Sequence, residues 1–206
     1  MPSPPPPSYY HRHLPHWQPE NRAIFLNWRL QGSLPEGWNQ RQPIPDPKHR
    51  PNPGRDFRVV DGLLDAAGAG PVWLKDPAIA DLVVDAFSHA ERELRLYRLK
   101  AWVVMANHVH LLIEPSVPLA RVTKVLKGYA ARQANQLLGR TGETFWQDES
   151  YDHWVRNQQE HYRIASYIER NPVTAGLVEK PEDWPWSSAR RGTDISVCPS
   201  APASKT

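Results

Sequence analysis

Runs of apolar residues bounded by polar ones predict four β-strands along the chain. Residues 94–105 alternate between apolar and polar side chains and are rich in valine, tryptophan and tyrosine, which favour strands. A two-residue turn follows, so we expect 108–114 to return as the antiparallel partner strand. Shorter runs of the same kind predict a first strand over 23–30 and a last one over 150–156.

Apolar residues that recur every three or four positions predict helices between these strands. The clearest pattern follows Asp76 and Pro77, a capping residue and a proline at the first helical position, and continues to Ala90. A second helix is predicted over 118–138. Its expected buried residues are Val122, Val125, Leu126, Tyr129 and Leu137.

A third helix is predicted from the capping residue Asn157, with Glu160 three positions later, to Pro172, which should stop it. Its expected buried residues are His161, Ile164, Ala165 and Ile168.

The resulting order is strand, helix, strand, strand, helix, strand and one further helix. This order predicts an α+β fold of the ferredoxin-like (RRM-like) type. It has one antiparallel sheet with helices packed on one face, and an extra C-terminal helix that carries a tyrosine. A domain of this shape favours nucleic-acid binding only by analogy of fold.

Proline marks the segments that should lie outside this fold. Thirteen of the 22 prolines precede residue 54. They predict a flexible proline-rich arm over 1–20 and a long loop over 33–54, followed by a short helix near Asp56–Asp65. We therefore expect a single domain over 21–190 and a disordered tail over 191–206.

Composition narrows the class of protein further. The single cysteine, Cys198, excludes an intramolecular disulfide and a multi-cysteine metal site. The first residues lack the basic and apolar regions of a signal peptide, and no apolar run approaches the roughly 18 residues of a membrane span. We expect a cytoplasmic protein without membrane contact, either a monomer or a homodimer.

Positive charge is concentrated in the middle of the chain. Residues 88–141 hold nine lysines and arginines against three glutamates, a net charge of +6, whereas the whole chain carries +3. Such a field attracts polyanions, although a solvated surface would explain the charge equally well.

His108 and His110 are the first candidates for chemistry. Residues two apart on a strand share a face, so both imidazoles should point the same way while Val109 points into the opposite layer. Two such imidazoles are half of a metal site. We expect them on an exposed ligand face, but two buried, hydrogen-bonded histidines would fit a bare His-x-His at least as well. His11 and His13 have the same spacing but no predicted strand to hold them.

Tyr167 and Asn171 are the second candidates. They lie four positions apart on the third predicted helix, one turn apart on one face, with Arg163 and Arg170 as neighbours of the phenol. An arginine stacked on a surface tyrosine is one interpretation. The other is a nucleophile beside phosphate-binding cations, with the Asn171 amide oxygen available to a metal.

The two candidates together suggest one reaction. Two imidazoles and an amide oxygen leave positions open on a divalent ion, Mg²⁺ or Mn²⁺, which can polarise a phosphodiester. Tyrosine has a pKa near 10, so it needs a cation or a base to become a nucleophile.

Four runs of the sequence resemble the REP-associated tyrosine transposases, which are small single-tyrosine HUH transposases acting on single-stranded DNA. They are Ala-Trp-Val-Val-Met-Ala-Asn-His-Val-His-Leu-Leu (101–112), Phe-Trp-Gln-Asp-Glu-Ser-Tyr-Asp-His (145–153), Tyr-Ile-Glu-Arg-Asn-Pro-Val-Thr-Ala-Gly-Leu-Val (167–178) and Asp-Trp-Pro-Trp-Ser-Ser-Ala (183–189). The resemblance covers about half of the chain, and the four runs occur in the family's order.

The resemblance implies an enzyme that cleaves and rejoins one DNA strand at a hairpin-flanked repeat through a 5′-phosphotyrosine. It places the histidine pair at His108 and His110, the nucleophile at Tyr167 and the third metal ligand at Asn171. Backbone phosphates would be contacted by six cations. The candidates are Arg121, Lys124, Lys127, Arg132, Arg163 and Arg170.

Two other functions remain open at this point. One is a non-catalytic binder of structured DNA or RNA with structural histidines. The other is a metal-dependent nuclease that activates water, with Tyr167 in a structural role. A protein–DNA adduct stable in SDS would indicate the transposase, free hydrolysed ends the nuclease, and retention without cleavage the binder.

Overall fold

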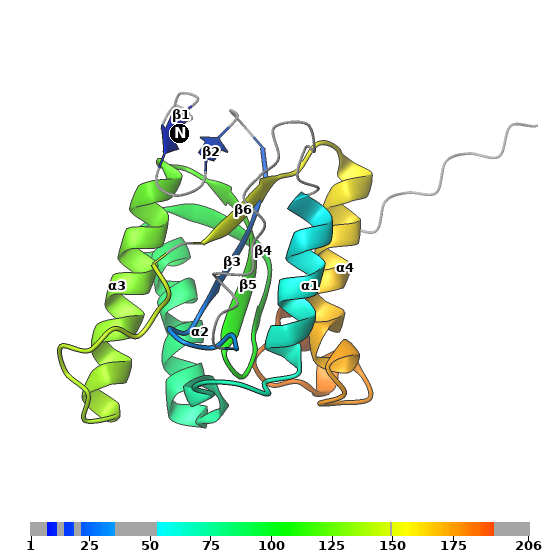
Figure 1. The fold of residues 1–206 in the computed structure, drawn as a ribbon. Helices are drawn as coiled ribbons and strands as arrows, with labels where there is room; N and C mark the ends of the chain where they lie inside the picture. The colour runs from blue at the N-terminus through cyan, green and yellow to red at the C-terminus, as the bar shows by residue number, and fades with distance from the viewer. Residues whose placement is uncertain (1–7, 12–14, 19–21, 36–52, 149, 192–206) are drawn as a thin grey trace, which may run out of the picture.

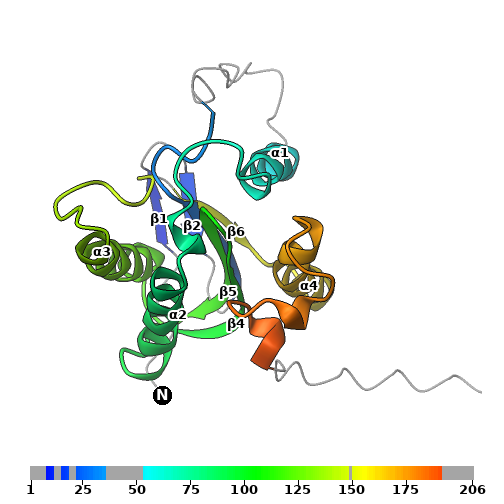
Figure 2. The ribbon, with the colours of Figure 1, turned by 90° about the horizontal axis from the view of Figure 1, so that it is seen from below.

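A computed structural model describes residues 8–11, 15–18, 22–35, 53–148 and 150–191, with side chains described from 22 to 35, from 59 to 148 and from 150 to 190. Its main body has three layers (Figure 1). A four-stranded sheet lies in the middle, helices α2 and α3 cover one face, and helices α1 and α4 cover the other, as the view from below makes clear (Figure 2).

The sheet is formed by β3 (Ile24–Arg29), β4 (Tyr97–Val104), β5 (His108–Pro115) and β6 (Tyr151–Trp154). Its strands are in the order β4-β5-β3-β6, and each neighbouring pair is antiparallel. The two central strands are therefore β5 and β3, which are almost completely buried. This topology is the ferredoxin-like arrangement, so the predicted fold class is confirmed.

Helices α2 (Pro77–Arg92) and α3 (Leu119–Leu137) form the first helical layer. Side chains of both helices pack on Val109, Leu111 and Ile113 of β5 in the larger hydrophobic core. The predicted buried face of α3 is partly wrong, because Tyr129 and Leu137 are exposed. The small residues Ala130 and Ala134 line the buried stripe instead.

Helices α1 (Pro53–Asp65) and α4 (Gln158–Thr174) form the second helical layer. Ala165 and Ile168 of α4 are fully buried against the smaller core, whereas His161 and Ile164 are only half-buried. Pro172 does not stop α4 as predicted. It lies in the last turn, which continues to Thr174.

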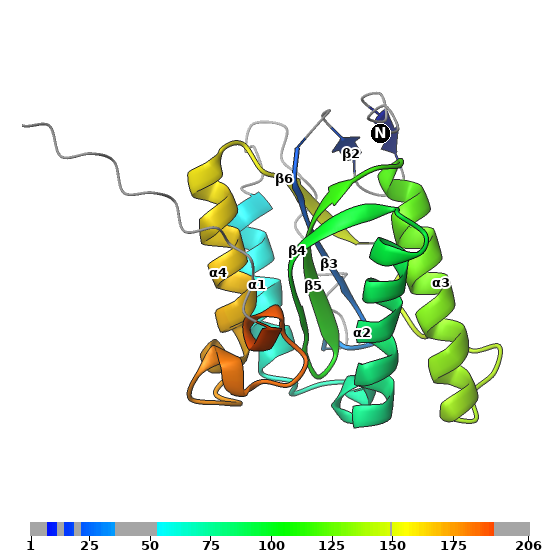
Figure 3. The same cartoon turned by 180° about the vertical axis from the view of Figure 1, so that it is seen from behind.

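The free edge of β4 is covered by the segment that follows α4, seen from behind in Figure 3. The backbone N–H of Val104 donates to the Trp186 carbonyl at 2.9 Å, and the Trp184 indole donates to the Val104 carbonyl at 3.0 Å. Such cover protects an edge strand from pairing with another chain.

A second, two-stranded sheet pairs β1 (Ser8–His11) with β2 (Pro15–Gln18). It lies inside the segment for which the sequence predicts a flexible arm. Aromatic residues, which favour strands, sit opposite each other in it, as at Tyr9 and Trp17. His11 thus lies on a strand, contrary to expectation, while His13 and most of the predicted loop over 33–54 fall outside the described residues.

Helix α4 begins with two reciprocal caps. The Asn157 side chain accepts from the Glu160 N–H at 2.9 Å, and the Glu160 carboxylate accepts from the Arg156 N–H at 2.7 Å. We expect Asn157→Ala to lower the free energy of unfolding by about 1 kcal/mol, because it leaves one N-terminal N–H without its acceptor. Urea denaturation would measure this. Gln159→Ala, one position inside the helix and exposed, is the control.

Among the described residues, no helix is long and apolar enough to cross a membrane.

Candidate active site and metal centre

Strand β5 directs His108 and His110 toward α1 and α4, while Val109 points into the larger core on the other face. The two Nε2 atoms are 3.1 Å apart. Both side chains are 0% exposed, so the expectation of an exposed ligand face is wrong. The cause is α1, which lies over this part of the sheet, whereas the sequence predicted a short helix there without a position on the sheet.

The outer nitrogen of each imidazole meets an asparagine amide. His108 Nδ1 donates to Asn107 Oδ1 at 2.8 Å, which leaves the Nε2 lone pair available. His110 Nδ1 lies 3.0 Å from Asn27 Nδ2, on the neighbouring strand β3. The His108 contact is the kind that fixes the ring of a metal-binding histidine, because the imidazole donates to an oxygen. Asn27 Nδ2 is a donor, so the same role at His110 requires the Asn27 amide to present its oxygen instead. Sequence reasoning did not identify either asparagine.

Tyr167 and Asn171 reach the same place from α4. The Tyr167 ring is centred 5.7 Å from the His110 ring and 6.3 Å from that of Phe25. Asn171 is 1% exposed, and its Oδ1 accepts no hydrogen bond from any described residue. The histidine pair, the tyrosine and the asparagine therefore come together within one chain.

The expected setting of Tyr167 between two guanidiniums is not what the structure has. The phenol packs against the smaller core, toward the sheet. Arg163 points away, with a side chain 75% exposed and an ion pair to Glu160 at 3.2 Å, and Arg170 is also exposed.

Asp61 of α1 is the main feature that sequence reasoning missed. Its Oδ1 lies 3.2 Å from His110 Nε2 and 3.7 Å from His108 Nε2, and the residue is 3% exposed. Asp65, one turn later, places a carboxylate oxygen 3.6 Å from His108 Nε2. Two carboxylates four apart on an amphipathic helix were the available signal, but nothing in the sequence placed that helix over β5.

Burial and proximity shift the ionisation of this group. Burial, with His110 nearby, lowers the pKa of His108 to about 3, so the ring is neutral and can act as a ligand. Burial, reinforced by the charge of Asp61, raises the pKa of Asp65 to about 7. Burial would also raise the pKa of Asp61, but His110, His108 and Asn171 outweigh it and hold that pKa below its ordinary value.

The donor set fits a divalent ion. The side-chain atoms that Asp61, His108 and His110 would offer to an ion all lie within 4.8 Å of one another. Imidazoles, a carboxylate and the Asn171 amide oxygen are ligand types that Mn²⁺, Mg²⁺ and Zn²⁺ accept in proteins.

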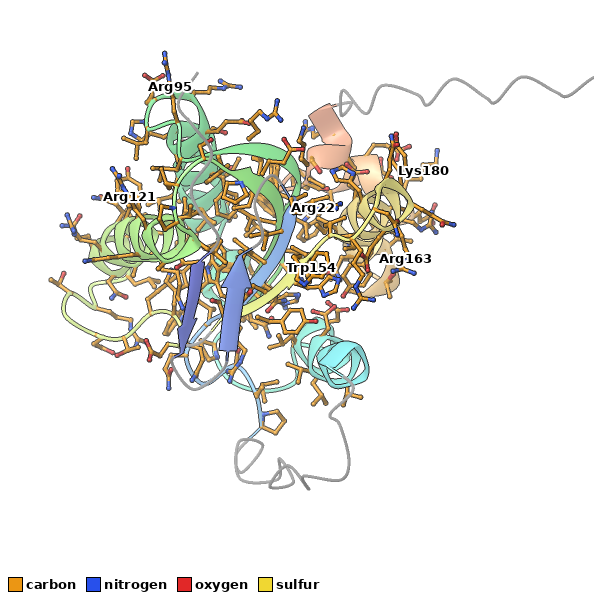
Figure 4. The ribbon with its side chains drawn as sticks, turned by 90° about the horizontal axis from the view of Figure 1, so that it is seen from above. Arg22, Arg95, Arg121, Trp154, Arg163 and Lys180 are labelled. Atoms are coloured by element: carbon orange, nitrogen blue, oxygen red, sulfur yellow. The ribbon has the colours of Figure 1, made fainter. Side chains whose placement is uncertain are left out.

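The basic residues of α3 are not brought to this site. Arg121, Lys124, Lys127 and Arg132 belong to the layer on the opposite face of the sheet. Figure 4 shows Arg121 and Arg163 on opposite sides of the strands. Lys127 also donates to the carbonyl oxygens of Gln147 and Asp148 at 2.6 and 2.8 Å, which ties down the loop before β6.

A cationic and aromatic patch at the start of α4 was not predicted. The Arg156 guanidinium lies over the Trp154 ring, 5.9 Å from its centre, and the Arg22 guanidinium donates to the Arg156 carbonyl at 2.8 Å. Both Trp154 and Arg22 are marked in Figure 4. Arginines here are exposed and Trp154 is half-buried, and a cation over an indole is a combination found on surfaces that bind single-stranded nucleic acid.

Comparison with known proteins places this site in a family context. The family model described as Transposase IS200 like matches residues 76–171. A REP-associated tyrosine transposase of Escherichia coli K12 is 29% identical over 108 residues, which are 51% of this chain and 62% of that protein. A relative from Haemophilus influenzae, named for the same family, is 35% identical over 54 residues, or 26% of this chain and 31% of the relative.

One solved structure, of a REP-associated tyrosine transposase bound to a REP hairpin, is 18% identical. Its TM-score is 0.49, and the match covers 89% of this chain and 84% of that one. The chain spans less than two thirds of the length of either curated relative. The resemblance predicted from the sequence is confirmed, since both curated relatives are named REP-associated tyrosine transposases.

Proposed function

We propose that this chain cleaves and rejoins one strand of DNA through a covalent bond to Tyr167. The observation that carries the proposal is the packing of Tyr167 against His110, 5.7 Å between ring centres, with Asn171 one turn below. This contact lies within one chain, which supports action of Tyr167 with its own histidine pair. The name of the E. coli relative supports a REP repeat as substrate. We propose that this substrate has a hairpin beside a single-stranded flank.

In the proposed step the Tyr167 oxygen attacks the scissile phosphorus. An oxygen–phosphorus bond to tyrosine forms as the bond to the 3′ oxygen breaks, and the proton lost by the phenol is balanced by one gained at the 3′-hydroxyl. One ester replaces another, so rejoining needs no ATP. We propose His108, His110 and Asn171 as ligands of Mg²⁺ or Mn²⁺, and the bound ion would neutralise charge on the phosphate.

Three groups of this chain prepare the step. Asn107 and Asn27 hold the imidazoles in place through their outer nitrogens. The smaller core fixes the phenol against β3 and β5. The buried setting limits access of water, which would otherwise compete with tyrosine for the phosphate.

The test is to trap the covalent product. The full chain is mixed with Mn²⁺ and a hairpin oligonucleotide whose flank is labelled at its far 3′ end. A labelled band that survives SDS, with the nucleotide located on Tyr167 by mass spectrometry, supports the proposal. Free 5′-phosphate ends without an adduct would indicate a nuclease instead, and binding without cleavage a non-catalytic binder.

We also propose how the DNA lies. The patch of Arg22, Trp154 and Arg156 adjoins α4 and suits the single-stranded flank. Arg163 and Arg170 are exposed on the same helix as Tyr167 and suit phosphates near the cut. The α3 cations are separated from Tyr167 by the sheet and would contact only the hairpin.

We propose a cytoplasmic location for the protein. The relatives are bacterial, and the DNA of bacteria lies in the cytoplasm.

Binding should therefore favour a hairpin with a flank over plain duplex, and should weaken steeply with salt. The slope of log Kd against log salt should fall by about one for each phosphate contact removed, for example in Arg121→Ala with Lys124→Ala. Fluorescence anisotropy at several salt concentrations measures both effects. Asp81→Asn, on α2, is the control. An unchanged slope in the double variant would remove α3 from the DNA interface.

A further inference from the structure

We propose that Asp61 is itself a ligand of the metal ion, so that helix α1 supplies the only charged donor of the described site. The inference rests on the proposed function, which supplies the assumption that a divalent ion binds at this site. It adds to the histidine pair and Asn171 a residue from a segment outside the part of the chain that matches the family model.

The spacing of the donor atoms is the first argument. Ligands about 2.1 Å from one ion lie roughly 3.0–3.5 Å from each other when the bonds diverge at octahedral or tetrahedral angles. The two imidazole Nε2 atoms are 3.1 Å apart, and Asp61 Oδ1 is 3.2 Å from one and 3.7 Å from the other. Two of the three distances lie in this range, and the third is slightly longer, so a small movement of the Asp61 side chain would let one ion hold all three atoms.

The charge of Asp61 is the second argument. A buried carboxylate is costly unless a cation or several donors satisfy it. Within the described part of the chain, Asp61 ion-pairs with no lysine or arginine. Asp61 instead lies against the two imidazoles and the amides of Asn27 and Asn171. A divalent ion would supply the missing positive charge.

The fixed position of α1 is the third argument. The connection that leaves α1 passes close to the turn after β3 at Gly70, where a Cβ would lie 2.0 Å from the Gly32 carbonyl oxygen. Gly70 also has a φ of +71°, which favours glycine. Leu64, one residue before the end of α1 and three after Asp61, is 1% exposed. The last turn of α1, which carries Asp61, is therefore packed into the protein and leads into a tightly packed connection.

The test measures metal affinity directly, without DNA. Mn²⁺ is titrated into the full chain and the free ion is followed by electron paramagnetic resonance. Asp61→Asn keeps the shape and removes the charged donor, and we expect its affinity for Mn²⁺ to fall at least about ten-fold. Asp65→Asn is the matched control, since it removes a neighbouring charge on the same helix but no ligand, and should change the affinity less than three-fold.

A second measurement needs no variant. Mn²⁺ should slow hydrogen exchange of the α1 amides in the wild-type chain, because the ion would join α1 to β5. In folded Asp61→Asn this protection should disappear while that of α4 remains.

Three results would each overturn the proposal. They are an unchanged Mn²⁺ affinity of Asp61→Asn, an equal loss of affinity in Asp65→Asn, and hydrogen exchange of α1 that is the same with and without Mn²⁺. His110→Gln separates this failure from failure of the proposed function. If His110→Gln loses Mn²⁺ and Asp61→Asn does not, the transposase site stands and Asp61 is not a ligand. If His110→Gln also keeps its affinity, the metal site itself is wrong.

Discussion

Tyr167→Phe is expected to abolish the covalent adduct and to reduce both cleavage and rejoining to background. The substitution removes one oxygen and keeps the ring, so the packing on Phe25 and His110 should persist. DNA affinity and thermal stability should therefore change little. Loss of the adduct with retained binding is the combination that identifies a nucleophile rather than a structural tyrosine. Label transfer in SDS gels and anisotropy on the same protein measure the two quantities.

Tyr151→Phe and Tyr162→Phe are the matched controls, and both should keep the adduct. Tyr151 packs on Phe25, 6.2 Å between ring centres, so it lies in the same region as Tyr167. Burial and the nearby charge of Asp152 raise its pKa, which makes it a weaker nucleophile. The Tyr162 hydroxyl accepts from Gln158 at 2.9 Å, and the residue lies about 140° around the helix from Tyr167. An adduct on either residue would overturn the assignment of Tyr167.

The part of the site on β5 was predictable because a strand has a strict period of two. Once His108 and His110 share a strand with Val109, the apolar residue determines which face meets the larger core, and the imidazoles must point to the other. The cap at Asn157 was equally local, since its side chain bonds a backbone group three residues away.

Features that depend on tertiary packing were not predictable in the same way. Tyr129 and Leu137 are more hydrophobic than Ala130 and Ala134, yet the alanines are buried, because small side chains let α3 approach its neighbours closely. Asp61 reaches β5 from a helix that is followed by a close approach of Gly70 to Gly32, two residues far apart in the sequence. Periodicity carries no information about such a contact.

The burial of the imidazoles changes how the metal should be tested. Alanine at His108 or His110 would leave a cavity and an unpaired asparagine amide inside the protein, so a loss of activity could reflect lost stability. Glutamine at position 110 fills more of the space than alanine and can still hydrogen-bond to Asn27. His110→Gln is therefore the better variant for testing the metal site.

His110→Gln is expected to reduce strand cleavage by several orders of magnitude, and EDTA should have the same effect on the wild-type chain. Added Mn²⁺ or Mg²⁺ should restore the chelated wild-type chain but not the variant, because a polarised phosphate is the part of the reaction that the ion supplies. Adduct formation across a metal titration measures this, with circular dichroism to show that the variant is folded. His11→Ala, in the other His-x-His pair, should cleave normally. Cleavage that survives chelation would mean that His108 and His110 are structural and that Tyr167 reacts without a metal.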